Sequence, residues 1–200
     1  MSGRIRGGGP APGRIVFGIV RLAAGHADGL GQFGTTREAF LASLAPLVAF
    51  PLVGGALLLL AGGGLAALAD LLATLCALMA PPVLSFEIAR LWDREAAWLR
   101  FATAFNWCQW VIPLIASFLL LGVGTLIRLG LPSEIGRTGA MIGLVSYGLW
   151  LHCFLARHGL SLSWPRAGLM VFGVNIATVV IVLGPTLLVL AVNGERLGAR

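Results

Sequence analysis

The sequence predicts an all-α fold: a polytopic membrane helix bundle with five transmembrane helices and an N-terminal amphipathic helix. Hydrophobic residues make up 58% of the 200 residues and charged residues only 11%, and the mean hydropathy is +0.93. Soluble domains average about 45–50% apolar and about 25% charged residues. So few charges cannot coat a globule of this size. The composition therefore excludes an ordinary soluble enzyme, a disordered chain and a coiled coil.

Five apolar segments are long enough to cross a hydrocarbon core of about 30 Å, which takes about 20 helical residues. Each is expected to be a helix, because a spanning segment must satisfy its backbone polar groups internally. The predicted spans are residues 40–61, 64–86, 101–126, 139–155 and 167–192.

The chain divides into three parts on this reading. Residues 1–38 form a cytoplasmic N-terminal segment, residues 39–193 the five-span membrane domain, and residues 194–200 a short C-terminal tail. Within the first part, Ile15, Ile19 and Leu22 recur at helical spacing, which predicts a short amphipathic helix on the membrane surface. The apolar run that ends at Arg21 is shorter than the roughly 7–15 residues of a signal-peptide core, so no cleaved leader is expected.

Local signals predict how the helices begin and connect. The spacing of Thr35 and Glu38 fits a capping box at the start of the first span. Three consecutive glycines, residues 62–64, suit a very tight helical hairpin, because glycine takes left-handed dihedrals without steric cost. Residues 87–100 alternate charged and apolar side chains, which favours a separate interfacial helix between the second and third spans.

The arginines predict the orientation. All fourteen basic residues are Arg, and on a five-span topology ten lie on the side of the N-terminus and four on the other. Positively charged connections stay in the cytoplasm, so the N-terminus is expected inside and the C-terminus in the periplasm of a bacterial inner membrane. The basic charge is then explained by topology and by contact with anionic headgroups, and no nucleic-acid partner is expected.

Asp70 is the most informative polar residue within a predicted span, because a central charge costs about 2.5–3.5 kcal/mol on insertion scales. Three interpretations remain open for it. It forms an ion or proton site, it makes a structural contact with Arg128 or Arg137 on the same side, or it is a protonated or interface-exposed carboxyl.

Four further polar side chains lie at similar depth in the third, fourth and fifth spans, and they predict one hydrogen-bonded cluster in the cytoplasmic half. Lone amides facing lipid are unfavourable, so burial between helices is expected, either as helix-to-helix hydrogen bonds or as ligand contacts. The four residues are Asn106, Gln109, His152 and Asn175.

Small residues at four-residue spacing predict close helix packing. They are Ala69, Ala73 and Ala77 in the second span, and Gly139 and Gly143 in the fourth. No Ser/His/Asp, paired-carboxylate, HExxH or Walker pattern is present, so no catalytic residue, metal site or cofactor is predicted.

Several short motifs resemble an uncharacterised family of small alphaproteobacterial multi-pass membrane proteins. They are Asp28-Gly29-Leu30-x-x-Phe33, then Phe40-Leu41-x-Ser43, Ala45-Pro46-Leu47, and Phe105-Asn106-Trp107 at the start of the third span. The resemblance covers about the first 110 residues. More distantly, five spans with a cytoplasmic N-terminus resemble Yip1-type membrane proteins in topology alone. Neither resemblance implies a catalytic residue.

Three functions compete. The leading hypothesis is a non-enzymatic accessory or organising factor that acts through helix–helix contacts, with the lipid bilayer, other membrane proteins or a second copy as partners. The alternative is a small transporter or channel that uses Asp70 or the polar cluster. A membrane enzyme is the third, and it would need a close pair of acid and base side chains.

Overall fold

The computed structural model describes residues 12–198, with side chains as far as residue 184. Arg4, Arg6 and Arg200, which count toward the predicted orientation, lie outside the described residues, and the side chain of Arg196 is not described. All described secondary structure is helical, as the sequence predicts. The elements are α1 (Pro12–Ala23), the 3-10 helix η1 (Ala27–Gln32), α2 (Arg37–Leu60), α3 (Gly64–Leu91), α4 (Glu95–Cys108), α5 (Val111–Arg128), α6 (Ser133–Gly159) and α7 (Trp164–Gly198).

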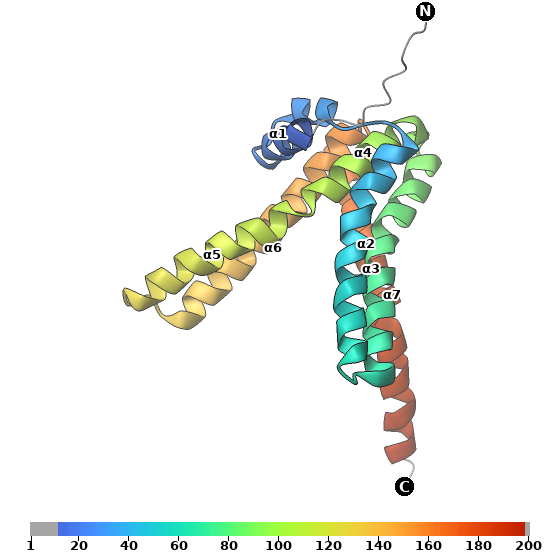
Figure 1. Cartoon of the computed structure of the whole chain (residues 1–200), viewed down its shortest axis with the longest axis vertical. Coiled ribbons are helices and arrows are strands. Elements are labelled where there is room, and N and C mark those ends of the chain that lie inside the picture. The colour runs from blue at the N-terminus through green and yellow to red at the C-terminus, as the bar shows by residue number, and fades with distance from the viewer. Residues whose placement is uncertain (1–11, 199–200) are drawn as a thin grey trace, which may run out of the picture.

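The helices form two arms that meet at one end (Figure 1). The first arm consists of α2, α3 and α7, and the second is the hairpin of α5 and α6. We call the end where they meet the junction; α1, η1 and α4 lie there, together with the end of α6 and the start of α7. The α2–α3 turn and the α5–α6 turn form the tips of the two arms and lie well apart.

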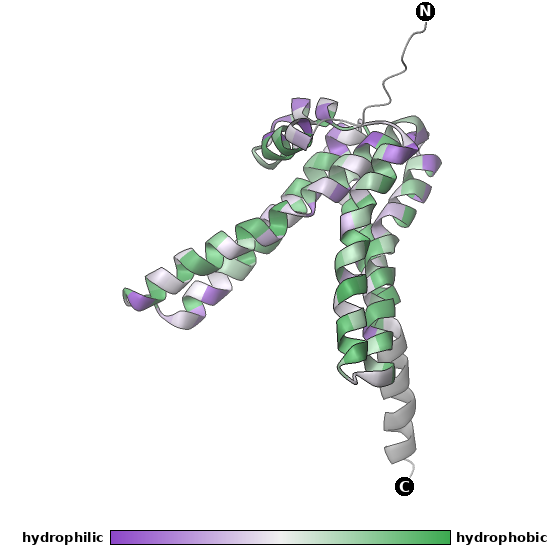
Figure 2. Ribbon diagram, in the orientation of Figure 1, coloured by the Kyte–Doolittle hydropathy of each residue, from purple (hydrophilic) through white to green (hydrophobic). Residues whose placement is uncertain are grey.

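Five helices are long and apolar enough to cross a membrane, which confirms the predicted number of spans. They are Arg37–Leu60, Gly64–Leu91, Glu95–Arg128, Ser133–Gly159 and Trp164–Gly184. The third combines α4 and α5, which follow one another with a short irregularity at Gln109 and Trp110. Apolar residues predominate along the part of both arms coloured in Figure 2, and Leu60 and Leu65 near the first tip are 85% and 84% exposed. Such surfaces are compatible with lipid rather than water.

The most densely packed core lies at the junction. Leu22 of α1 and Leu151 and Leu155 of α6 are fully buried there, and Phe101 of α4 is 3% exposed. Among the side chains that the structure describes, few in the arms away from the junction are buried. The chain therefore holds itself together mainly where α1, α4, α6 and α7 converge.

Glycine and threonine shape the ends of the first two spans. The three-glycine turn forms as predicted, with left-handed backbone at Gly62 (φ +89°) and Gly64 (φ +56°). The helix start is displaced by one residue: Thr36, not Thr35, precedes α2, and its Oγ1 accepts a hydrogen bond from the Ala39 backbone N–H at 3.2 Å. The two threonines are adjacent, and the three-residue spacing to Glu38 led to the prediction of Thr35 as the capping residue in place of Thr36.

The prediction of a separate interfacial helix over residues 87–100 is wrong. α3 continues through Glu87 and Arg90, which form an ion pair at 2.6 Å one turn apart. The chain then reverses over Trp92–Arg94 with Asp93 in the left-handed region (φ +55°), and α4 begins at Glu95. Aspartate tolerates this conformation better than most residues, because its short polar side chain forms local hydrogen bonds.

The amphipathic helix is present as α1 and is fastened to the junction by η1. The Arg21 guanidinium donates to both carboxylate oxygens of Asp28, at 3.1 and 2.5 Å, and this hydrogen bonding lowers the pKa of the Asp28 carboxyl. The pair is therefore kept at neutral pH and is lost as the pH falls through that lowered value. The Tyr147 hydroxyl of α6 donates to the Ala23 carbonyl at 2.9 Å, which ties the end of α1 to the second arm.

Candidate functional site

A small pocket with polar side chains lies inside the junction, between α3, α4, α6 and α7. Its polar members are Ser85 of α3, Asn106 of α4, His152 of α6 and Asn175 of α7. Phe105, Met170 and apolar neighbours fill the rest of the wall. Three of the four residues predicted to cluster thus line one pocket, although they come from three different helices.

The pocket volume is about 30 Å³. A buried water needs about 10–15 Å³, so the pocket suits one or two water molecules. Drug-sized ligand sites are about 300–1,000 Å³. A pocket of this size is therefore suited to hydrating its own polar groups and not to holding a substrate.

Asn106 makes the deepest interhelical hydrogen bond. Its Nδ2 donates to Oγ of Ser43 on α2 at 3.0 Å, and the Ser43 hydroxyl in turn donates to the Phe40 carbonyl at 2.6 Å. Asn106 is 3% exposed and Ser43 is fully buried. Both residues belong to the short motifs quoted above, which lie 63 residues apart in the sequence and meet in the structure. A bond of this kind contributes about 0.6–2 kcal/mol within a membrane.

A second hydrogen bond joins α4 to α3. The Trp98 indole Nε1 donates to Oγ of Ser85 at 3.1 Å, and the Ser85 hydroxyl donates to the Pro82 carbonyl at 3.1 Å. The sequence alone does not identify Ser43 or Ser85 as hydrogen-bond partners, because a lone serine in an apolar run carries little signal. A buried amide such as Asn106 and a half-buried indole such as Trp98 each need a hydrogen-bond partner, and this requirement could have indicated the two serines.

The four clustered residues do not form the expected single hydrogen-bonded network among the described residues. The Nδ2 of Asn175 donates to the Val171 carbonyl of its own helix at 2.7 Å. The His152 ring lies against the Phe105 ring, with centroids 4.8 Å apart. Gln109 is not part of the pocket wall; it caps the end of α4 through its backbone N–H.

Asp70 lies far from this pocket. It is exposed in the second turn of α3, close to the first tip, and forms no ion pair within the described part of the chain. Arg128 and Arg137 lie near the other tip, where Arg137 faces Glu134 at 3.4 Å. The contact between Asp70 and these arginines is therefore not made, because the arms diverge.

The small-residue positions differ in their surroundings. Ala69 is exposed, whereas Ala73 and Ala77 are half-buried on α3, which packs against α2 and α7. Gly139 and Gly143 are exposed on α6, and a Cβ built on either would meet nothing within 4 Å. Within the described residues, no packing contact requires either of these two glycines.

Among residues 12–184, no three His, Cys, Asp or Glu side chains are grouped so that they could hold a metal ion. No family model, curated protein or solved structure matches this chain.

Proposed function

We propose that the chain is an accessory or organising protein of a membrane, which acts by lateral helix–helix contact through the exposed face of α6. This face, the α6 face, comprises Ile135, Gly139, Ile142 and Gly143. Ile135 and Ile142 are 63% and 59% exposed, and the glycines between them leave the backbone uncovered. Small residues at this spacing let a second helix approach closely in lipid.

The contrast between three glycines of α6 supports the proposal. At Gly136 an added Cβ would lie 2.9 Å from Cγ1 of Val123, so the packing of α5 against α6 explains why this residue is small. The same packing does not explain Gly139 or Gly143, because nothing lies within 4 Å of the position that a Cβ would take there. Other exposed helical glycines, such as Gly54, are equally uncovered, so the support for a partner helix comes from the four-residue spacing of Gly139 and Gly143 on one face of α6.

The geometry favours association over transport. The junction pocket suits one or two waters, and Asp70 stands near a tip, on a different part of the molecule from the remaining polar residues. A coupled transporter needs its ionisable group and its polar site to act together at a water-accessible cavity. Association with a second helix is therefore the proposed function, and transport is the alternative.

Enlarging the α6 face tests association. The double variant Gly139→Leu/Gly143→Leu is expected to reduce cross-linking from a photoreactive residue at position 142 at least about fivefold, because overpacking costs about 1–3 kcal/mol. Gly54→Leu is the matched control: Gly54 is also an exposed helical glycine with nothing within 4 Å of its Cβ position, on the other arm. Equal cross-linking yields for the two variants, at equal amounts of folded protein, would reject the α6 face.

We further propose that the protein lies in a bacterial inner membrane with its N-terminus in the cytoplasm. Support comes from the described arginines: eight lie at the junction end of the molecule, in its elements or in the adjoining ends of α2 and α3, and two lie near the second tip. We expect reporter fusions at Arg200 to give a periplasmic signal and fusions between α3 and α4 a cytoplasmic one. A cytoplasmic signal at Arg200 would contradict this orientation.

A further inference from the structure

A groove larger than the junction pocket opens on the surface of the first arm, between α2, α3 and α4. Its volume is about 580 Å³, within the range of ligand-binding pockets. Six of its lining residues define its mouth, walls and floor: Arg37 and Leu41 of α2, Val83 and Phe86 of α3, and Glu95 and Trp98 of α4.

The floor of the groove is aromatic and held in place. The Trp98 ring packs between those of Phe40 and Phe86, with centroids 5.2 and 5.0 Å apart. The Trp98 indole is also fixed by its hydrogen bond to Ser85. The walls are aliphatic and open: Leu41 is 60% and Val83 59% exposed. The groove is therefore preformed and offers apolar surface along the direction of the spans.

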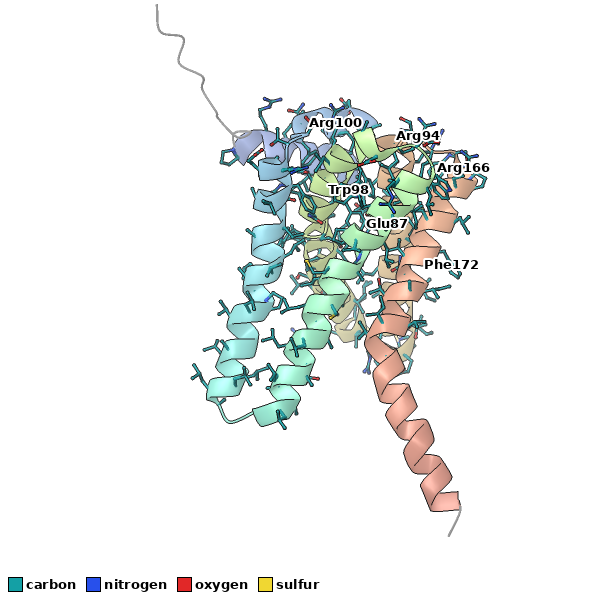
Figure 3. The ribbon with its side chains drawn as sticks, turned by 90° about the vertical axis from the view of Figure 1, so that its right-hand side faces the viewer. Glu87, Arg94, Trp98, Arg100, Arg166 and Phe172 are labelled. Carbon is teal, nitrogen blue, oxygen red and sulfur yellow. The ribbon has the colours of Figure 1, made fainter. Side chains whose placement is uncertain are left out.

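The mouth of the groove carries one charge of each sign. Arg37 is the first residue of α2 and Glu95 the first residue of α4, and both are exposed. Neither forms a salt bridge in the part of the chain whose side chains are described. Figure 3 shows this end of the first arm, with Trp98 and Glu87 below Arg94, Arg100 and Arg166.

The charges lie at the junction end and the apolar walls extend from there into the first span, as in an amphiphile with its head at the membrane surface. A guanidinium binds a phosphate by paired hydrogen bonds, and a carboxylate accepts hydrogen bonds from a primary ammonium group. One positive and one negative side chain at one mouth complement a headgroup that carries both charges.

We propose that this groove binds one phospholipid whose headgroup combines a phosphate with a primary ammonium, as in phosphatidylethanolamine. Arg37 binds the phosphate, Glu95 accepts from the ammonium, and an acyl chain lies along Leu41 and Val83 over the aromatic floor. A quaternary ammonium cannot donate to Glu95, and a glycerol headgroup leaves that carboxylate without a cation. The groove thereby selects among lipids, whereas the rest of the apolar surface does not. This inference is independent of the α6 face.

Native mass spectrometry of the full chain in mild detergent tests the site, with phosphatidylethanolamine, phosphatidylglycerol and phosphatidylcholine added in turn. We expect one phosphatidylethanolamine per chain, bound about fivefold more tightly than the other two, the upper range for one exposed ion pair. Glu95→Gln is expected to invert the order of phosphatidylethanolamine and phosphatidylglycerol, and Arg37→Gln to weaken both. Glu134→Gln and Arg128→Gln are the matched charge controls near the second tip.

Filling the groove gives an independent measurement. Val83→Trp is expected to remove the bound lipid, whereas Leu72→Trp, an exposed position of α3 outside the groove, leaves it in place. Circular dichroism establishes that each variant is helical. Equal binding of the three lipids together with no effect of Val83→Trp would overturn the proposal. A lipid-free dimer that breaks up on Val83→Trp would also overturn it, because a second copy would then occupy the groove.

Discussion

Leu155→Ala is expected to lower the free energy of unfolding by about 2–5 kcal/mol, the range for truncating a fully buried leucine. Leu155 has no exposed surface and belongs to the junction core, so its removal leaves a cavity where α4, α6 and α7 converge. Unfolding in mixed micelles with increasing SDS, followed by far-ultraviolet circular dichroism, measures the change.

Leu149→Ala is the control for this measurement. Leu149 lies on the same helix but is 42% exposed, and lipid replaces the contacts of a truncated side chain there. We expect a change below about 1 kcal/mol. Similar losses for Leu149→Ala and Leu155→Ala would show that stability is spread along α6, against the conclusion that it is concentrated at the junction.

Gly29→Val is expected to detach α1 from η1. A Cβ at this position would lie 2.8 Å from the Gly18 carbonyl oxygen and 2.9 Å from Cβ of Arg21, and the first of these is backbone that cannot turn aside. Overpacking of about 1–3 kcal/mol raises the population of the open state by a factor of about 5 to 160. Trypsin cleavage at Arg21 should accelerate by that factor, because cleavage follows the open population when reclosing is fast.

Gly31→Val tests whether the effect comes from close packing or from a general loss of helix η1. Gly31 belongs to the same 3-10 helix, is exposed, and has nothing within 4 Å of an added Cβ. We expect its cleavage rate to stay within about twofold of the unmodified chain, since surface substitutions change stability by about 0.5 kcal/mol. Equal acceleration by both variants would contradict the docking contact between Gly18 and Gly29.

Hydropathy and local glycine signals were sufficient to predict the five spans and the first hairpin, because both depend on nearby residues alone. The segment over residues 87–100 failed for the opposite reason. Its charges suggested a separate helix, but the Glu87–Arg90 pair lies on α3 itself, and the reversal at Asp93 depends on how α3 meets α4. A group of charged residues indicates that a segment lies near the membrane surface, but it does not determine at which residue a helix ends.

The polar residues show a similar limit. Depth along a helix follows from counting residues, and this brought Asn106, His152 and Asn175 to one level. Which neighbouring helix a side chain faces depends on the angles at which the helices cross, and nearby residues in the sequence do not determine those angles. Asn106 instead bonds to Ser43 on α2, a helix that contributed no residue to the predicted cluster. Gln109 falls at the irregularity between α4 and α5.

The divergence of the two arms gives the molecule a tapered outline. The two arms lie close together at the junction, and their tips lie well apart (Figure 1). In a bilayer, arms that diverge in this way reach across more lipid in the leaflet at their tips than in the leaflet at the junction.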